Sequence, residues 1–278
     1  MNLLRLSWRQ FRRGWRAGEL TVMALALALA LAAVSAVGFF TARVQTAVLE
    51  QAGVSLAADL VLSARAPIPA RYTQQAHAAG ARTAEVLDFP TVVLRDTHTL
   101  LVEVHAVSAG YPLRGHARLS AQPFGKATPA DGIPARGTLW AEPRIFSNLG
   151  IATGDSLRVG KLDARVAASI AYLPDNGFGF SALAPKLVLN LADIPASGLV
   201  NTNSRVSYKL LIAGTPDVIA KLDRQWKADL PAGIRLRDAR DSGPQMVNAI
   251  DRSTRFLSLA ALVSVLISAV AVVLSARR

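Results

Sequence analysis

The sequence predicts an α+β membrane protein in which two transmembrane helices flank an exported α/β body with a β-rich insert. Three observations support this fold class. Two long segments carry no charged residue, basic residues crowd beside those segments, and apolar residues alternate with polar ones along short stretches of the 215 residues between them.

The two uncharged segments are Leu20–Phe40, with 21 residues, and Phe256–Leu274, with 19 residues. As helices they would measure about 32 Å and about 28 Å, which suits a hydrocarbon core of roughly 30 Å. The first segment has one rival interpretation, a cleaved signal peptide with Ala33-Val-Ser-Ala as the cleavage site. Its length and the long arginine-rich stretch before it favour an uncleaved anchor.

The net charge of +12 is unevenly distributed. Residues 1–19 carry +4 and residues 275–278 carry +2, so half of the charge lies in the 23 residues that border the uncharged segments. This is the positive-inside pattern, and it predicts that both termini are cytoplasmic and that the central residues are exported. Basic residues in the middle are mixed with acidic ones, so we expect no nucleic-acid partner.

The predicted organisation has five parts. Residues 1–19 form a cytoplasmic amphipathic elbow helix, 20–40 the first transmembrane helix, 41–255 the exported body, 256–274 the second transmembrane helix and 275–278 a cytoplasmic tail. Within 2–16, the apolar residues Leu4, Trp8, Phe11 and Trp15 fall on one helical face and the arginines on the adjacent one. Both transmembrane helices are expected to continue into the body as stalk helices, the first of them stopping at Gly53.

Alternation and turn residues predict the elements of the body. The expected strands are 59–63, 85–94, 100–107, 156–159, 165–172, 187–191, 206–213 and 234–237. The expected helices are 69–79, 142–148 and 216–230, the last opened by Thr215-Pro216. The strand–helix–strand units at 59–94 and 206–237 are expected to form one domain from two halves. Residues from about 110 to 200, rich in Pro and Gly, are interpreted as an insert.

Motifs for catalysis or cofactor binding are missing from the sequence. It contains no cysteine, no phosphate-binding loop with its Gly-Lys-Ser/Thr, no Gly-x-Ser-x-Gly and no His-Glu-x-x-His. We therefore expect no enzymatic activity, no catalytic residue, no cofactor and no metal site. The best metal candidates are Glu103 and His105 on one strand face with His98 nearby, and structural or exposed roles are favoured for these and for His77 and His116.

A glycine-rich stretch, Pro174-Asp-Asn-Gly-Phe-Gly-Phe, resembles a phosphate-binding loop. It lacks a following helix N-terminus and a lysine, so a β-turn or a flexible hairpin is the favoured interpretation. Its aromatic residues Phe178 and Phe180 are expected either in the core or against a lipid or partner.

Several motifs resemble those of FtsX-like ABC transporter permeases, in family order and over essentially the whole chain. The quoted stretches are Arg12-Arg-Gly-Trp-Arg-Ala-Gly-Glu-Leu, Val37-Gly-Phe-Phe, Ala58-Asp-Leu-Val-Leu, Tyr111-Pro-Leu-Arg-Gly, Pro134-Ala-Arg-Gly-Thr-Leu-Trp, Leu149-Gly-Ile-Ala-Thr-Gly-Asp, Leu183-Ala-Pro-Lys, Leu191-Ala-Asp-Ile-Pro-Ala-Ser-Gly-Leu-Val and Ser204-Arg-Val-Ser-Tyr-Lys-Leu-Leu-Ile-Ala-Gly. The last two are the most specific to the YbbP-type branch, a relative of the MacB and LolC/LolE permeases.

The resemblance implies a MacB-like periplasmic core domain, a porter-like α/β unit carrying an insert, in a bacterial inner-membrane protein. It further implies a cytoplasmic ATPase partner, whose motion the stalks would pass to the periplasmic domain to move a hydrophobic or lipid-like substrate. A periplasmic esterase or thioesterase and membrane lipid are the other implied partners. Family members are longer than this chain, so it is expected to be a truncated product or a fragment of a permease.

Two other functions stay open at this stage. A two-span, membrane-anchored periplasmic sensor or binding module would share the layout but would need a separate signalling partner. An anchored periplasmic hydrolase is disfavoured because the nucleophile motifs are absent.

Overall fold

The computed structural model describes residues 53–175, 184–201 and 204–238, together with scattered single positions within 28–43 and 252–263. Two compact units divide the chain, one of residues 49–242 and one of residues 1–48 with 243–278. The first unit, called the body from here on, contains all the elements described below.

Within the described residues, no helix is both long enough and apolar enough to cross a membrane. The expected spans at 20–40 and 256–274 lie outside those residues except for single helical positions, and the expected elbow helix at 2–16 lies wholly outside them.

One mixed sheet organises the body. Over the described residues the strands follow the order β11–β1–β10–β2–β3–β9–β6–β8–β4–β5, and β7 pairs with both β2 and β8. The strands of the first part are β1 Leu60–Ala64, β2 Arg82–Arg95, β3 His98–Val107, β10 Ser207–Ala213 and β11 Ile234–Asp238. The others are β4 Arg118–Ser120, β5 Thr128–Pro129, β6 Thr138–Ala141, β7 Ser156–Val159, β8 Leu162–Tyr172 and β9 Lys186–Asn190.

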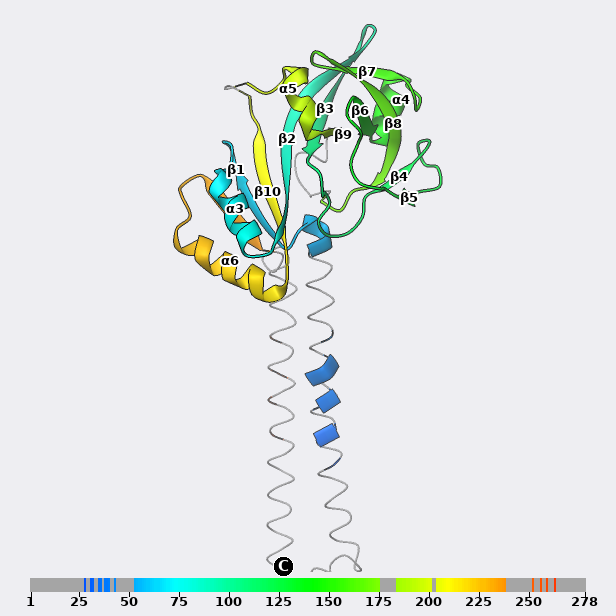
Figure 1. The fold of residues 1–278 in the computed structure, drawn as a ribbon. Coiled ribbons are helices and arrows are strands. Elements are labelled where there is room, and N and C mark those ends of the chain that lie inside the picture. Colours follow the sequence, from blue (N-terminus) through cyan, green and yellow to red (C-terminus); the bar gives the residue numbers. More distant parts are fainter. Residues whose placement is uncertain are drawn as a thin grey trace, which may run out of the picture. The chain divides into compact units, whose positions relative to one another are not determined.

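Helices α3 (Ala70–Ala78) and α6 (Pro216–Ala228) cover one face of β1 and β10 (Figure 1). Side chains alternate along a strand, so Leu60, Leu62, Leu210 and Ile212 point toward the helices and are buried with Trp226. The indole Nε1 of Trp226 also donates a 2.7 Å hydrogen bond to Gln75 Oε1 on α3. Two segments far apart in sequence thus build one layer, which confirms the prediction of a domain made from two halves.

The chain enters and leaves this layer at adjacent positions. Strands β1 and β11 are antiparallel neighbours, and Leu60, the first residue of β1, pairs with Asp238, the last residue of β11. The two ends of the body are therefore joined by a strand ladder.

The strands of residues 110–200 continue the same sheet and do not form a separate one. Strand β9 pairs in parallel with β3, and β7 returns to β2, so β2–β3–β9–β6–β8–β7 close into a ring within the described part of the chain (Figure 1). Its interior is filled by Phe89, Val93, Val104, Leu157 and Leu187. Helix α4 (Pro143–Leu149) adds Ile145, Phe146 and Leu149 to the same core.

Several short elements of the body were missed by the sequence pattern. Strands β4, β5 and β6 are two to four residues long, and 3₁₀-helix η2 (Leu191–Asp193) and α5 (Ile194–Ser197) are equally short. The remaining predicted strands and helices are confirmed within a few residues at each end.

The stop predicted at Gly53 is wrong. Residues 53–56 are helical, and the helix ends at Ala57, which adopts φ of 55°. The amide of Ala58 donates to the carbonyl of Gly53 and the amide of Ala57 to that of Val54. These are the two hydrogen bonds of a Schellman motif, which ends the helix one turn later than the glycine suggested.

Candidate functional site

Polar and charged side chains gather on the face of the sheet opposite α3 and α6. The strand registers align Ser63 with Lys209, Ser207 with Asp88, and Asp88 with His105. Because directly paired residues lie on the same face, these side chains lie in neighbouring rows on one face of β1, β10, β2 and β3. The next row on this face contains Glu103 of β3, which pairs with Lys186 of β9.

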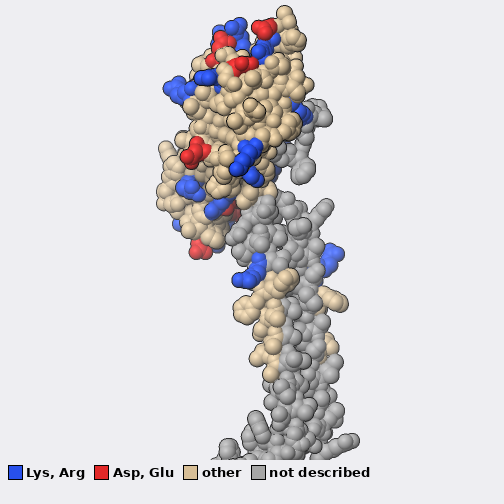
Figure 2. All heavy atoms as spheres, turned by 90° about the vertical axis from the view of Figure 1, so that its right-hand side faces the viewer, with Lys and Arg blue, Asp and Glu red and all other residues tan. Residues whose placement is uncertain are grey.

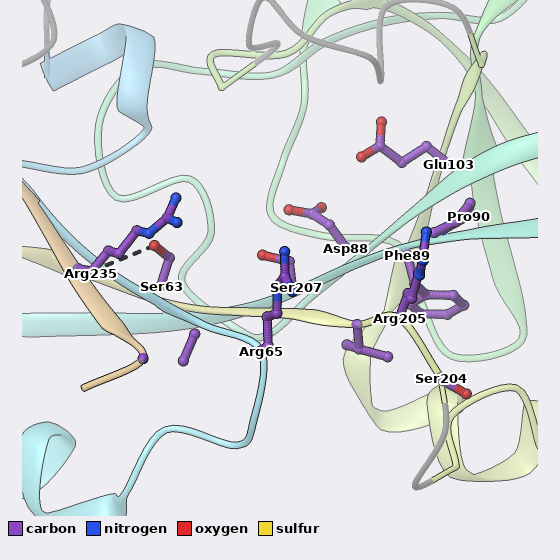
Figure 3. A pocket seen from close by; sticks show the side chains of 13 residues that line it. Ser63, Arg65, Asp88, Phe89, Pro90, Glu103, Ser204, Arg205, Ser207 and Arg235 are labelled. Carbon is purple, nitrogen blue, oxygen red and sulfur yellow. Dashed lines mark hydrogen bonds between the residues drawn. The ribbon is translucent and has the colours of Figure 1, made fainter. Parts of the chain in front are cut away.

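A groove of about 860 Å³ opens along these rows. Its lining residues are Ser63, Ala64, Arg65, Asp88, Phe89, Pro90, Glu103, Ser204, Arg205, Val206, Ser207, Gly233 and Arg235. Figure 3 shows Asp88 and Glu103 projecting from neighbouring strands into the groove, with Arg235 on the far side. We call this feature the sheet-face groove.

Behind the groove lies a buried ionic cluster of Asp88, His105, Tyr111, Asp175 and Lys209. Asp88 Oδ1 lies 2.5 Å from His105 Nδ1, and Asp88 Oδ2 lies 2.6 Å from Lys209 Nζ. On the other side of the ring, His105 Nε2 lies 3.2 Å from Asp175 Oδ2, an ion-pair contact without good hydrogen-bond geometry. His105 is thus held between two carboxylates.

The charges within the cluster shift the pKa values of its members. Burial by itself would lower the pKa of His105, but the carboxylates of Asp175 and Asp88 outweigh it and raise the pKa to about 9. Burial would raise the pKa of Asp88, yet His105 and Lys209 lower it to about 2. The pKa of Asp175 is lowered in the same way against its burial, chiefly by the charge of His105. At neutral pH two carboxylates therefore balance one imidazolium and one ammonium.

Tyr111 connects the cluster to the loop that follows β3. Its hydroxyl donates a 2.5 Å hydrogen bond to Asp175 Oδ1, and its ring meets the imidazole of His105 edge-on at 5.2 Å. Burial and then the charge of Asp175 raise the pKa of Tyr111 well above its usual value. The phenol therefore stays protonated as a donor.

Glu103 differs from the paired acids around it. Its Oε2 is buried and has no hydrogen-bond partner in the described part of the chain. Burial, followed by the nearby charge of Asp88, raises the pKa of Glu103, while Lys186 acts in the opposite direction. Among the acids described on this face, the ionised form of Glu103 is therefore the least stabilised.

The sequence-selected histidines do not converge. Glu103 and His105 share a face of β3 as expected, but His98 lies exposed at the opposite end of that strand. His116 is exposed in the loop before β4, and His77 Nε2 lies 2.7 Å from Thr83 Oγ1. No group of three or more His, Asp or Glu side chains suited to a metal ion occurs in the described residues.

Of the five cluster members, sequence reasoning singled out His105 and missed the other four as site residues, namely Asp88, Tyr111, Asp175 and Lys209. The available signal was a charged residue at an inward position of an alternating strand, as for Asp88 between Val86 and Pro90. Asp175 ends the described part of the Pro174 turn, and Phe178 and Phe180 lie outside the described residues.

Charged side chains are dispersed over the face of the body that Figure 2 shows. Figure 2 shows a face of the body on which blue and red side chains intermingle at the tip and a broad uncharged area lies below them. The basic residues on this face form no continuous patch.

Comparison with known proteins identifies one similar curated relative. It is an uncharacterized ABC transporter permease, YbbP, of Escherichia coli (strain K12), and it is 29% identical over 264 residues. This chain resembles a YbbP-type ABC transporter permease. The alignment covers 95% of this chain and 32% of the permease, so the chain spans about a third of the relative's length. No protein-family model matches the chain.

Two of the similar solved structures show the low sequence identity of these matches. One is the periplasmic region of MacB from Actinobacillus actinomycetemcomitans, with 8% identity and a TM-score of 0.45 over 70% of this chain and 94% of that one. The other is the extracellular domain of the noncanonic ABC-type transporter YknZ from Gram-positive bacteria. It shows 7% identity and a TM-score of 0.40 over 64% of this chain and all of that one.

Proposed function

We propose that this chain is part of the permease, the non-catalytic membrane subunit, of an ABC-type transporter in a bacterial inner membrane. The observation that carries the proposal is the likeness to a YbbP permease along 95% of the chain. The subunit would couple ATP hydrolysis by a cytoplasmic partner to movement of a hydrophobic or lipid-like substrate on the periplasmic side. The esterase or thioesterase partner stays a prediction.

The contacts of the body support a mechanical role. Motifs quoted from distant parts of the sequence meet as fixed contacts: Asp59 with Arg114, Tyr111 with Asp175, and Asp193 with the amide of Gly137. Such contacts hold the elements of the body in one arrangement. Because β1 and β11 are paired neighbours, a displacement that enters at both ends would move the whole sheet.

The proposal is tested by pulling down the full permease and measuring an associated ATPase. Reversing the charge at Arg9, Arg12 and Arg13 to Glu is expected to disturb either the orientation in the membrane or the recovery of the ATPase. The matched control replaces the same three residues by Lys, which keeps the charge. If the Glu variant keeps its membrane orientation and its ATPase, the predicted elbow helix of residues 1–19 has no part in either. Protease digestion that places the body on the cytoplasmic side would overturn the proposal as a whole.

A membrane-anchored binding module is the second candidate, and the sheet-face groove is the observation that favours it. The two functions differ in what the groove would hold and in what would copurify. Tight binding of a small polar ligand, in a complex that lacks an ATPase, would favour the binding module.

A further inference from the structure

A second cleft lies on the face of the sheet opposite the sheet-face groove. Its volume is about 320 Å³, and two paired positions of β10 and β2 form its floor, Tyr208 with Leu87 and Leu210 with Glu85. Because side chains alternate along a strand, these four point away from Asp88, which lines the groove. We call this feature the helix-side cleft, since it opens on the side of the sheet that α3 covers.

The walls of the helix-side cleft are mostly apolar. Pro67 and Ile68, which lead into α3, contribute one part of the lining, and Leu191 of η2 with Ile194 and Pro195 of α5 contributes another. Ile68 packs against the core beneath α3 and α6, and Leu191 packs against the core of the ring. The cleft therefore lies between two hydrophobic cores, and a ligand in it would bury apolar surface against both.

Three polar side chains of the cleft are available to a ligand, namely the carboxylate of Glu85 and the hydroxyls of Thr73 and Tyr208. Within the residues that the structure describes, none of the three side chains forms a hydrogen bond or an ion pair. Lys209 also borders the cleft, but its Nζ lies on the other face of the sheet, 2.6 Å from Asp88 Oδ2. No described cation of the cleft therefore compensates the charge of Glu85.

We propose that the helix-side cleft binds a small primary amine with an apolar body, its ammonium group held by Glu85, Thr73 and Tyr208. An ammonium group has three donors, which match one carboxylate and two hydroxyl oxygens. A carboxylate ligand would be repelled by Glu85, and a neutral one would leave its charge uncompensated. The volume is at the lower end of the usual range for a bound small molecule, so the apolar body is small.

This site goes beyond the proposed function, because it lies on another face of the body and takes another class of ligand than the one proposed for the permease. It holds whether or not the chain serves a transporter. Failure to bind an amine would overturn this site and leave the transporter proposal as it stands, whereas absence of an ATPase would count against the transporter alone.

The test uses the full chain in phosphatidylcholine vesicles and follows the protection of a thiol. Because the sequence contains no cysteine, Leu191→Cys introduces a single thiol into the wall of the cleft, and Ala192→Cys introduces one at the adjacent exposed position. Mass spectrometry measures the rate at which iodoacetamide modifies each thiol in the presence of hexylamine, hexanol or hexanoate.

Hexylamine should slow modification of the Leu191→Cys thiol, with half-protection at a concentration about fivefold lower than hexanol requires, and hexanoate should have no effect. The factor is modest because Glu85 is exposed and its charge is screened by water. The Ala192→Cys thiol should react at the same rate throughout. Equal protection by hexylamine and hexanol, or equal slowing at both thiols, would overturn the proposal.

Replacing Glu85 isolates the contribution of its charge. In the Leu191→Cys background, Glu85→Gln should raise the concentration of hexylamine for half-protection about fivefold and leave that of hexanol unchanged. The matched control is Asp131→Asn, at an exposed acid in the loop after β5, which should change neither value. An unchanged value for hexylamine in the Glu85 variant would overturn the proposal. The comparison of hexylamine with hexanol needs no change at Glu85, so it stays decisive even if that variant folds poorly.

The two hydroxyls are tested in the same background. Tyr208→Phe and Thr73→Val keep the shape of each side chain and remove one acceptor, so each should raise the half-protecting concentration of hexylamine about threefold without affecting hexanol. Tyr172→Phe, at an exposed position of β8, is the control and should have no effect. Unchanged values in both hydroxyl variants would overturn the three-point site.

Discussion

Asp59 and Arg114, 55 residues apart in sequence, are joined by two hydrogen bonds. Arg114 Nε donates to Asp59 Oδ1 at 2.9 Å and Arg114 Nη2 donates to Oδ2 at 2.7 Å. Both residues also bind Gly214, since Arg114 Nη2 donates to its carbonyl and its amide donates to Asp59 Oδ2. The pair therefore fixes the loop after β3 to the start of β1 and the end of β10.

Removing this pair should destabilise the body. We expect Asp59→Ala to lower the free energy of unfolding by about 1–3 kcal/mol, because Arg114 and the amide of Gly214 lose their acceptor. Arg114 is partly exposed, so Arg114→Met should cost less. Thermal unfolding of the full chain in detergent measures both changes. If a double-mutant cycle shows that the two effects are additive, the interaction between Asp59 and Arg114 contributes no free energy to stability.

The phenol of Tyr111 gives a second prediction. Tyr111→Phe keeps the buried ring but leaves Asp175 without its 2.5 Å donor, which should cost about 1–3 kcal/mol of stability. The control is Tyr172→Phe, at an exposed position where the change should be within about 0.5 kcal/mol. A Tyr111 variant as stable as its control would contradict the proposed bond.

The imidazolium of His105 is expected to hold the cluster together. His105→Ala would leave Asp88 and Asp175 buried near each other without the charge between them, at a cost of about 3–5 kcal/mol. His105→Gln, which keeps a donor but no charge, should recover only part of that loss. Equal stability of the Gln variant and the unmodified protein at pH 6 would show that the charge is not needed.

The same cluster predicts the pH dependence of stability. The folded pKa of His105, about 9, exceeds its unfolded value of about 6.5, so its contribution is complete below pH 6.5 and is lost as the pH rises through 9. The folded pKa of Asp88, about 2, is below its unfolded value of about 3.9, so its contribution is present above pH 4 and is lost as the pH falls toward 2. Unfolding measured from pH 2 to 10 should show greatest stability between pH 4 and 6.5.

The variant His105→Gln tests the alkaline part of this profile. It should abolish most of the loss of stability above pH 6.5. An unchanged loss would show that groups other than His105 cause it.

Gly160 and Gly132 form a matched pair for a steric prediction. Both adopt positive φ, 62° and 82°, but a Cβ on Gly160 would lie 2.4 Å from the carbonyl oxygen of Ser197, whereas one on Gly132 would meet nothing within 4 Å. Gly132→Ala should cost about 1 kcal/mol of stability from backbone strain alone. Gly160→Ala should cost at least about 2 kcal/mol more, because the backbone must also move. Similar melting temperatures for the two variants would mean that the backbone of the β7–β8 turn can shift at little cost in stability.

Local pattern predicted most of the regular elements of the body and could not predict how they join. The alternation along β2, β3 and β10 is long enough to be unambiguous, and Thr215-Pro216 marks the start of α6. Strand β6 was missed because it becomes a strand by pairing with β8 and β9, which no local pattern specifies.

The site was less predictable than the fold. Glu103 and His105 were recognised as neighbours on one strand face because that relationship depends only on their spacing of two. The partners of His105 come from β2 and from the turn after β8, and no local pattern specifies that pairing. Family resemblance pointed to the right stretches, since Asp59, Tyr111 and Arg114 lie in the quoted motifs, but it did not say that those residues contact one another.

The pairing of Leu60 with Asp238 determines how the body responds to load. Hydrogen bonds between antiparallel strands lie perpendicular to the strands. If β1 and β11 are drawn apart from this shared end, the bonds break one after another, as in a zipper, and each step meets little resistance. If both strands are pulled in the same direction by the same amount, the hydrogen bonds between them are not strained and the sheet moves as a rigid body. The body is thus stiff when its two ends move together and compliant when they separate sideways.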